Sequence, residues 1–263
     1  MMRASLRRHL VRLAFGVALA CGSAWPAAAQ AQTPPEPAPA ESAADFLFGA
    51  PHAWLGVRGS YLVPRAGGDF FTFVRDQLTL DNADFRAAGL SGDLGIVLPH
   101  GLDVVVGADV NRRTAPSEYR HFIASNGQPI AQTTRVRQTG VRAGLRWSPL
   151  SRGQRISRLA FIPRRVVPYV DAGMTTTFYS WSQVGQFVDA TSFAVFNDHF
   201  GSDGWATGPY AGGGVDLQLY RVLYFTVHAR YTWLHGALGS DFTGFDGIDL
   251  SGLRTSTGFT VVF

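Results

Sequence analysis

The chain has 263 residues, of which 46% are hydrophobic and only 16% are charged. Its 23 basic residues exceed its 19 acidic residues, but four of the basic residues, Arg3, Arg7, Arg8 and Arg12, precede every acidic residue. Without those four, basic and acidic residues balance at 19 each. A neutral remainder argues against a basic surface for nucleic acid, so we expect no nucleic-acid partner.

The amino-terminal segment predicts a secretory signal peptide over residues 1–29. The four Arg residues precede a short apolar run at 13–20, and small residues at 27–29 offer a cleavage site. The apolar run is too short for a spanning helix. Cys21, the single cysteine, lies in this segment, so cleavage leaves no thiol. The alternative is lipidation at Cys21, because residues 18–21 resemble a lipoprotein box.

Residues 30–50 are rich in Pro and Ala and predict a periplasmic linker, since this composition cannot build a core. Phe46, Leu47 and Phe48 are the exception. We expect these three residues to pack against the lower rim of the domain that follows, which spans residues 51–263.

That domain predicts an all-β fold, because segments of about ten residues repeatedly alternate apolar and polar side chains. A strand that crosses a bilayer needs about 9–11 residues. The predicted strands are 55–63, 90–98, 102–111, 138–147, 169–178, 211–219, 223–233 and 253–263.

The two faces of these strands indicate the surroundings of the domain. One face is apolar and carries aromatic residues near its ends, such as Tyr61, Trp147 and Trp233, whereas the other is rich in Gly, Thr, Asp and Arg. Apolar-out and polar-in alternation predicts a transmembrane antiparallel up-and-down β-barrel, most simply with eight strands. A soluble lipocalin-like barrel is the alternative.

Connection lengths support this topology. Predicted long links span about 64–87, 113–134, 182–207 and 235–251, and tight turns lie at 99–101 and around Arg221. Long extracellular loops and short periplasmic turns alternate in bacterial barrels, which places both termini in the periplasm. Residues 149–167, with five Arg, break the rule. A ten-strand reading would need a hairpin at 119–135, which we interpret instead as strands three and four projecting above the membrane.

The final strand carries the one recognisable motif. Gly258, Phe259, Val261 and Phe263 resemble the carboxy-terminal assembly signal of outer-membrane β-barrel proteins, and residues 53–263 are similar in pattern to the small OmpA/OmpX-type barrels. The resemblance implies a monomer in the outer membrane that contacts lipid and lipopolysaccharide. It also implies the barrel-assembly machinery as a partner during biogenesis.

Charged residues recur on the predicted inner face. An eight-stranded barrel is just wide enough for its side chains to fill it, so these charges must pair. We predict a salt-bridged plug, with a narrow ion-conducting lining as the alternative. The set comprises Arg58, Asp93, Asp103, Asp109, Arg142, Arg146, Asp171, Asp216, Arg230 and Arg254, with His228 in the same layer.

No pattern predicts catalysis or a cofactor. No His precedes a Ser at the spacing of lipid A deacylases, and the adjacent Asp198 and His199 fit the omptin proteases poorly. With Asp203, they are expected to decorate a solvated loop. Acidic residues at 241–249 lack EF-hand spacing, so we expect contact with lipopolysaccharide rather than a calcium site, and we expect no metal.

Residues 69–78 place apolar side chains at helical spacing and predict a short amphipathic helix over the barrel mouth or in the lipid surface. Its aromatic residues could also bind a partner. The preferred function is non-enzymatic: envelope structure, or surface binding through the long loops. A small passive channel for ions or small solutes is the alternative, followed by an enzyme acting on lipid A or peptides.

Overall fold

The computed structural model of the protein describes residues 46–189 and 191–263. The predicted signal peptide, Cys21 and most of the predicted linker lie outside these residues. Within them, no helix is long and apolar enough to cross a membrane.

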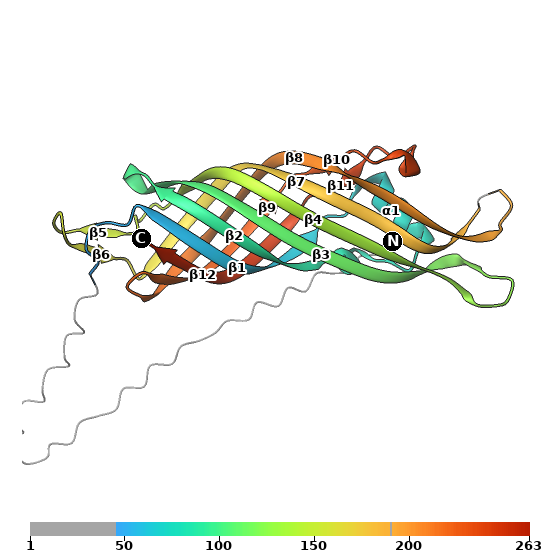
Figure 1. The fold of residues 1–263 in the computed structure, drawn as a ribbon, viewed down its shortest axis with the longest axis horizontal. Helices are drawn as coiled ribbons and strands as arrows, with labels where there is room; N and C mark the ends of the chain where they lie inside the picture. The colour runs from blue at the N-terminus through green and yellow to red at the C-terminus, as the bar shows by residue number, and fades with distance from the viewer. Residues whose placement is uncertain (1–45, 190) are drawn as a thin grey trace, which may run out of the picture. The chain divides into compact units, whose positions relative to one another are not determined.

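Eight antiparallel strands pair in a closed ring, in the order β1-β12-β9-β8-β7-β4-β3-β2 (Figure 1). This ring confirms the predicted eight-stranded barrel and leaves no place for a ten-strand reading. The strands are β1 (Ala53–Pro64), β2 (Ala87–Val97), β3 (Leu102–Ile123), β4 (Pro129–Trp147), β7 (Val166–Val188), β8 (Val195–Tyr220), β9 (Leu223–Thr232) and β12 (Gly252–Val262).

The first and last strands close the ring. Trp54 lies opposite Val262, and the register continues to Pro64 opposite Gly252. Beyond the paired strands, the backbone oxygen of Phe263 accepts hydrogen bonds from the amides of His52 and Ala53 at 2.8 and 2.9 Å. The last residue therefore takes part in closing the barrel.

We expect Phe263→Asp to lower the amount of folded barrel in outer-membrane fractions, because it adds a charge to the apolar end of the closing strand. Heat-modifiable migration of the membrane-extracted protein measures this amount. Phe48→Asp is the matched control, since Phe48 is 86% exposed and lies outside the ring. Equal yields from both variants would contradict a role for Phe263 in assembly.

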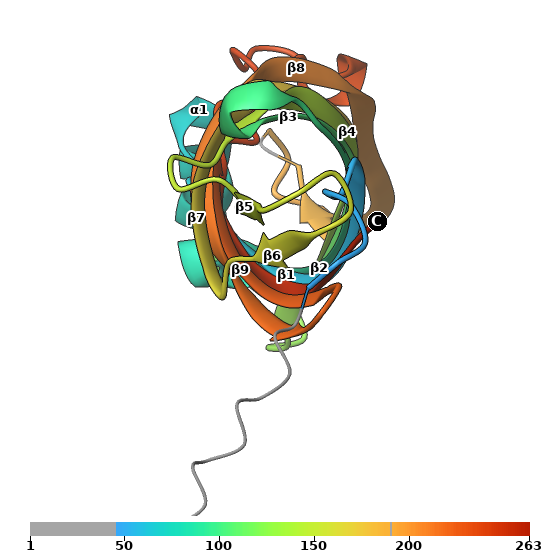
Figure 2. The same cartoon turned by 90° about the vertical axis from the view of Figure 1, so that its left-hand side faces the viewer.

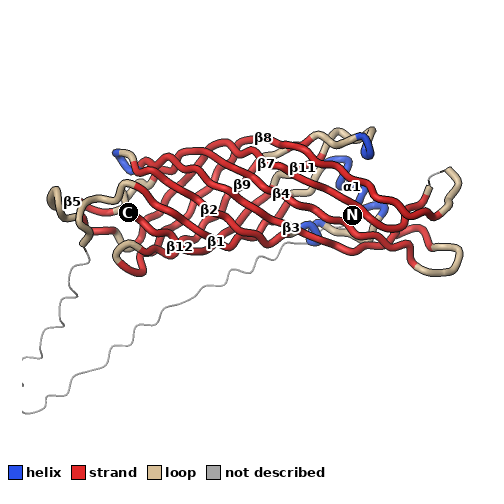
Figure 3. Tube along the Cα trace, in the orientation of Figure 1, coloured by secondary structure: helices blue, strands red, loops and turns tan. Residues whose placement is uncertain are grey.

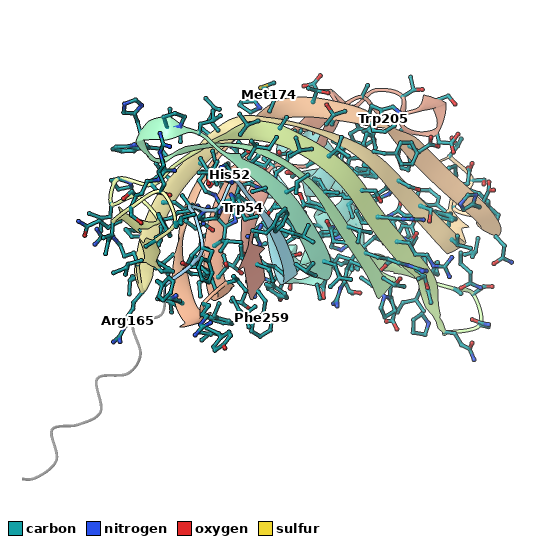
Figure 4. All side chains as sticks on the ribbon, turned by 60° about the vertical axis from the view of Figure 1, so that its left-hand side comes forward. His52, Trp54, Arg165, Met174, Trp205 and Phe259 are labelled. Carbon is teal, nitrogen blue, oxygen red and sulfur yellow. The ribbon has the colours of Figure 1, made fainter. Side chains whose placement is uncertain are left out.

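The side chains alternate between the two faces as the sequence predicted. Apolar residues along the ring are exposed, including Val106 at 54%, and Met174, Trp205 and Phe259 point away from the barrel (Figure 4). The alternate residues on the same strands are buried, and many are polar or charged. An apolar exterior around a polar interior is the arrangement of a transmembrane β-barrel.

The two ends of the barrel differ. At one end, which we call the turn end, β2 joins β3 through η2 (Pro99–Gly101), and β8 joins β9 at Arg221 and Val222. The carboxy-terminal end of β12 and the first described residues also lie there (Figure 1). At the opposite end, the loop end, the hairpins β3–β4 and β7–β8 extend well beyond the other strands (Figure 1).

Two segments that were predicted as long links, 113–134 and 182–207, are mostly paired strand in these extended hairpins. The pairing of β3 with β4 continues to Ile123 and Pro129, so most of 113–134 is strand, as the projecting-strand interpretation held. Residues 182–207 were expected to form a loop, but β7 pairs with β8 out to Val188 and Val195. Asp198, His199 and Asp203 therefore lie on a paired strand rather than in a loop. Polar residues fit these positions because the strands here lie beyond the apolar belt.

The long link at 149–167 contains a second small hairpin, formed by β5 (Gly153–Arg155) and β6 (Phe161–Pro163). Figure 2 shows this hairpin lying across the opening at the turn end. Leu47 bridges to Phe161 through two backbone hydrogen bonds of 2.8 and 3.0 Å. Leu47 thus packs at this rim, beside the hairpin, whereas Phe46 and Phe48, which were expected to pack there too, are exposed.

The loop end is covered by helical segments (Figure 3). The predicted helix is present as α1 (Gly68–Gln77), and η1 (Asn82–Phe85), η3 (Ser240–Phe242) and the short pair β10 (His235–Gly236) and β11 (Ile248–Asp249) accompany it. Phe70 and Phe71 of α1 pack edge-on against Trp181, which faces inward from β7. The helix therefore lies over the barrel mouth and builds an apolar core there.

Candidate functional sites: a charged lumen and an aromatic pocket

All eleven residues predicted to form the lumen network are buried, and they come from all eight ring strands. Arg58, for example, has only 1% of its surface exposed. Charges this deeply buried require partners, because an unpaired ion in a confined site is costly.

The centre of the lumen is organised around two carboxylates on neighbouring strands. Asp109 on β3 accepts hydrogen bonds from Arg142 at 2.6 Å, from Arg230 at 2.7 Å and from Ser91 at 2.6 Å. Asp93 on β2 forms ion pairs with both Arg58 and Arg142. Arg142 thus bridges the two carboxylates, and the five strands that carry these groups are tied together across the interior.

The turn end contains a residue that the sequence analysis missed. Arg152, from the link at 149–167, is buried and donates to Asp103 at 2.7 Å and to Asp216 at 3.3 Å. Asp103 also accepts from the indole of Trp54 at 2.9 Å, and Asp216 accepts from Thr226 at 2.7 Å. No period-two pattern could have revealed Arg152, because it lies outside the ring strands.

Aromatic rings enclose a neighbouring cation. The guanidinium of Arg146 lies 4.1 Å from the ring centre of Trp54 and 3.7 Å from that of Tyr169. Its Nη1 atom is 3.7 Å from Asp216. A cation between two ring faces gains electrostatic stabilisation where water is scarce. Arg146, Trp54, Tyr169 and Arg152 are all buried in the lumen near the turn end.

Two members of the predicted network pair differently from expectation. Asp171 bonds to His228 at 2.9 Å rather than to an Arg, and His228 stacks on Tyr169. Arg254 has neutral partners within bonding distance, Asn111 at 2.9 Å and Ser60 at 3.3 Å. With Arg152 included, six Arg face five Asp in the described lumen, so the five-to-five pairing is corrected.

A small cavity lies among these side chains. The cavity between Asp109, Asn111, Arg230 and Arg254 has a volume of about 20 Å³, which is enough for a single water molecule. Leu234 and Leu250 also line this cavity, and both belong to the apolar core that includes Phe70, Phe71 and Val74 of α1. Charged and polar groups therefore surround this small cavity, and apolar side chains lie on its loop-end side.

A larger cavity of about 480 Å³ lies at the loop end, and we call it the aromatic pocket. It lies among α1, η3 and the extended hairpins β3–β4 and β7–β8. The residues that line it are Phe73, Val74, Gln77, Leu78, Tyr119, Phe122, Gln132, Gln183, Phe187, Val188, Phe193, Phe196, Phe200, Asp241, Phe242 and Phe245. The sequence pattern anticipated only its α1 side.

Local contacts hold the walls of this pocket in place. The backbone amide of Thr79 donates to the oxygen of Glu118 at 2.8 Å, and Arg120 donates to the backbone of Arg75 at 2.8 Å, so the end of α1 is fastened to β3. At the tip of β7–β8, Ser192 and Thr191 donate hydrogen bonds to Asp189, which lowers the pKa of that carboxyl. The tip that presents Phe193 to the pocket is thereby constrained.

The acidic residues of 241–249 do not converge on one point. Asp241 accepts from the amide of Gly201 at 3.0 Å, and Asp249 accepts from the amide of Gly67 at 3.2 Å. Each carboxylate thus fixes a different backbone segment. Among residues 46–189 and 191–263, no group of three or more His, Cys, Asp or Glu is placed to hold a metal ion.

No protein-family model and no curated protein matches the chain. Among solved structures, the outer membrane protein OprG from Pseudomonas aeruginosa aligns at 12% identity with a TM-score of 0.48, over 82% of this chain and 98% of OprG. Neisserial surface protein A aligns at 13% identity with a TM-score of 0.44, over 80% and 97%.

The attachment invasion locus protein Ail of Yersinia pestis aligns at 14% identity with a TM-score of 0.36, over 81% of this chain and 99% of Ail. The fold assignment itself rests on the closed ring of strand pairs and on the apolar outer face. In fold, the chain resembles the small eight-stranded barrels of the OmpA/OmpX type, as the sequence predicted.

Proposed function

We propose that this protein is a non-enzymatic barrel of the bacterial outer membrane with a closed lumen, and that its loop end is a surface binding platform. The turn end and both termini face the periplasm, and the extended hairpins face the exterior. The observation that carries the proposal is Arg152, which crosses the turn end to reach Asp103 and Asp216.

The hydrogen-bonded charges of the lumen favour a closed state. Asp109, Asp103 and Asp216 each accept hydrogen bonds from two or three donors, so opening a path would leave several buried charges without partners. Breaking a buried pair by removing one partner costs about 3–5 kcal/mol. Opening a path through the lumen would break several of these pairs at once and would cost more than breaking a single pair. A passive channel must open more easily than this.

The extended hairpins support binding rather than envelope structure alone. A barrel that only spans the membrane gains nothing from strands that continue beyond the apolar belt, whereas β7–β8 remains paired out to Val188 and Val195. Paired strands hold side chains in place better than free loops do, and precise placement favours recognition.

Conductance tests the closed lumen. We expect the purified full-length protein to show no steady conductance in planar bilayers. Arg152→Ala is expected to produce a small leak, because it removes a side chain from the turn end. The leak should favour cations, since Asp103 and Asp216 lose their shared partner.

Arg155→Ala is the matched control, since Arg155 lies on the same hairpin and is exposed. Stable ohmic openings of the unmodified protein would refute the closed lumen and favour the small channel.

A further inference from the structure

We propose that the aromatic pocket binds a small, uncharged aromatic molecule that carries one hydrogen-bond donor, such as an aromatic alcohol. The inference rests on the proposed surface-binding function and names the ligand class of that platform.

The residues that line the aromatic pocket favour a ligand with an aromatic ring system. Eight phenylalanine rings and one tyrosine ring line about 480 Å³, a volume in the range of small-molecule sites. Their arrangement is ordered, because Phe187 and Phe200 meet edge-on at 4.6 Å between ring centres, and Phe73 lies 5.3 Å from Phe245. Aromatic ligands gain both apolar burial and ring-edge contacts on such walls.

The charges around the pocket exclude an anion. No Arg, Lys or His is among its lining residues, and its single ionisable acid is Asp241. Burial raises the pKa of the Tyr119 phenol, which keeps that group neutral at pH 7. A carboxylate or phosphate would lose its hydration here and would meet another negative charge. Lipopolysaccharide phosphates and fatty acids are therefore poor occupants.

One polar side chain in the pocket favours a ligand that carries a hydrogen-bond donor. Gln132 lines the pocket from β4 and is only 5% exposed, yet its Oε1 atom accepts no hydrogen bond from any described residue. The neighbouring Gln183 is engaged through its amide nitrogen, because its Nε2 atom donates to the hydroxyl of Thr134 at 3.3 Å. A buried acceptor without a partner is costly, so a ligand hydroxyl at Gln132 would be favoured.

The pocket also ends blindly. The apolar core of α1, Trp181 and Leu234 separates it from the charged lumen, because this one cluster contributes Val74 and Phe242 to the pocket and Leu234 and Leu250 to the small cavity below. A molecule bound there has no open route along the barrel axis. The pocket is therefore a site of capture at the cell surface.

Calorimetric titration of the full-length protein in lipid nanodiscs tests this inference, with empty nanodiscs subtracted to remove partition into the bilayer. The probes are 1-naphthol, naphthalene and 1-naphthoate. We expect 1-naphthol to bind about tenfold more tightly than naphthalene, as one added hydrogen bond predicts. The naphthoate anion should bind more weakly than either neutral probe.

Three variants locate the site. Gln132→Leu should remove the tenfold preference for 1-naphthol and leave naphthalene binding unchanged. Gln138→Leu is the matched control, since Gln138 is equally buried on the same face of β4 but lines the lumen cavity, and it should keep the preference. Phe196→Ala should weaken both neutral probes by about fivefold.

Equal binding of 1-naphthol and naphthalene, equal binding of the anion, or a preference that survives Gln132→Leu would each overturn the inference. These failures are distinct from failure of the closed lumen. Conductance of the unmodified barrel would refute the closed lumen without changing these titrations, and absence of probe binding in a silent barrel would refute the pocket alone.

Discussion

Asp109→Ala is expected to destabilise the barrel by about 3–5 kcal/mol, because it leaves a buried guanidinium without its carboxylate. Asp109 accepts bonds from Arg142, Arg230 and Ser91. Arg142 keeps Asp93 as a partner, but Arg230 has no second carboxylate within bonding distance among the described residues. Urea unfolding in lipid vesicles, followed by tryptophan fluorescence, measures the loss in free energy of unfolding.

The control for this change is Asp203→Ala. Asp203 is exposed on the extended part of β8, so its removal should change the free energy of unfolding by less than about 0.5 kcal/mol. Similar small effects of both substitutions would mean that the lumen charges are well hydrated. That result would weaken the plug and strengthen the channel alternative.

Arg substitution on the outer face is expected to have the second-largest effect. Val106 on β3 and Val215 on β8 lie on the apolar outer face, opposite Ala143 and Val227 on the neighbouring strands. An Arg at mid-membrane on the lipid face of such a barrel costs about 2–4 kcal/mol. Val106→Arg and Val215→Arg should therefore lower the free energy of unfolding by this amount in the same vesicle assay.

Two controls separate the cost of lipid transfer from the cost of packing. Ser182→Arg faces outward on the extended part of β7, beyond the apolar belt, and should cost less than about 0.5 kcal/mol. Thr175→Arg faces the lumen, where it avoids the lipid cost but crowds a filled interior. If Arg at Val106, Val215 and Ser182 proved equally harmless, the outer face would not contact lipid.

The sequence by itself determined the barrel. Alternation has a period of two in the ring strands, so the position of a residue along the strand predicts the face on which it lies. The faces assigned from sequence agree with the exposure of Val106 and with the burial of Asp109 and Arg142. The spacing of residues 69–78 likewise predicted α1, because helical periodicity is a local property. Both kinds of pattern depend only on neighbours along the chain.

Only the tertiary structure decided how the charges pair and where the pocket lies. Arg152 reaches Asp103 and Asp216 across 49 and 64 residues, and Asp171 bonds to His228 because β7 and β9 flank β8. Gln132 and Phe200 meet in one pocket only because two hairpins extend together over α1. Alternation gives the face of each side chain, whereas partners across the lumen depend on how the closed ring brings distant strands together.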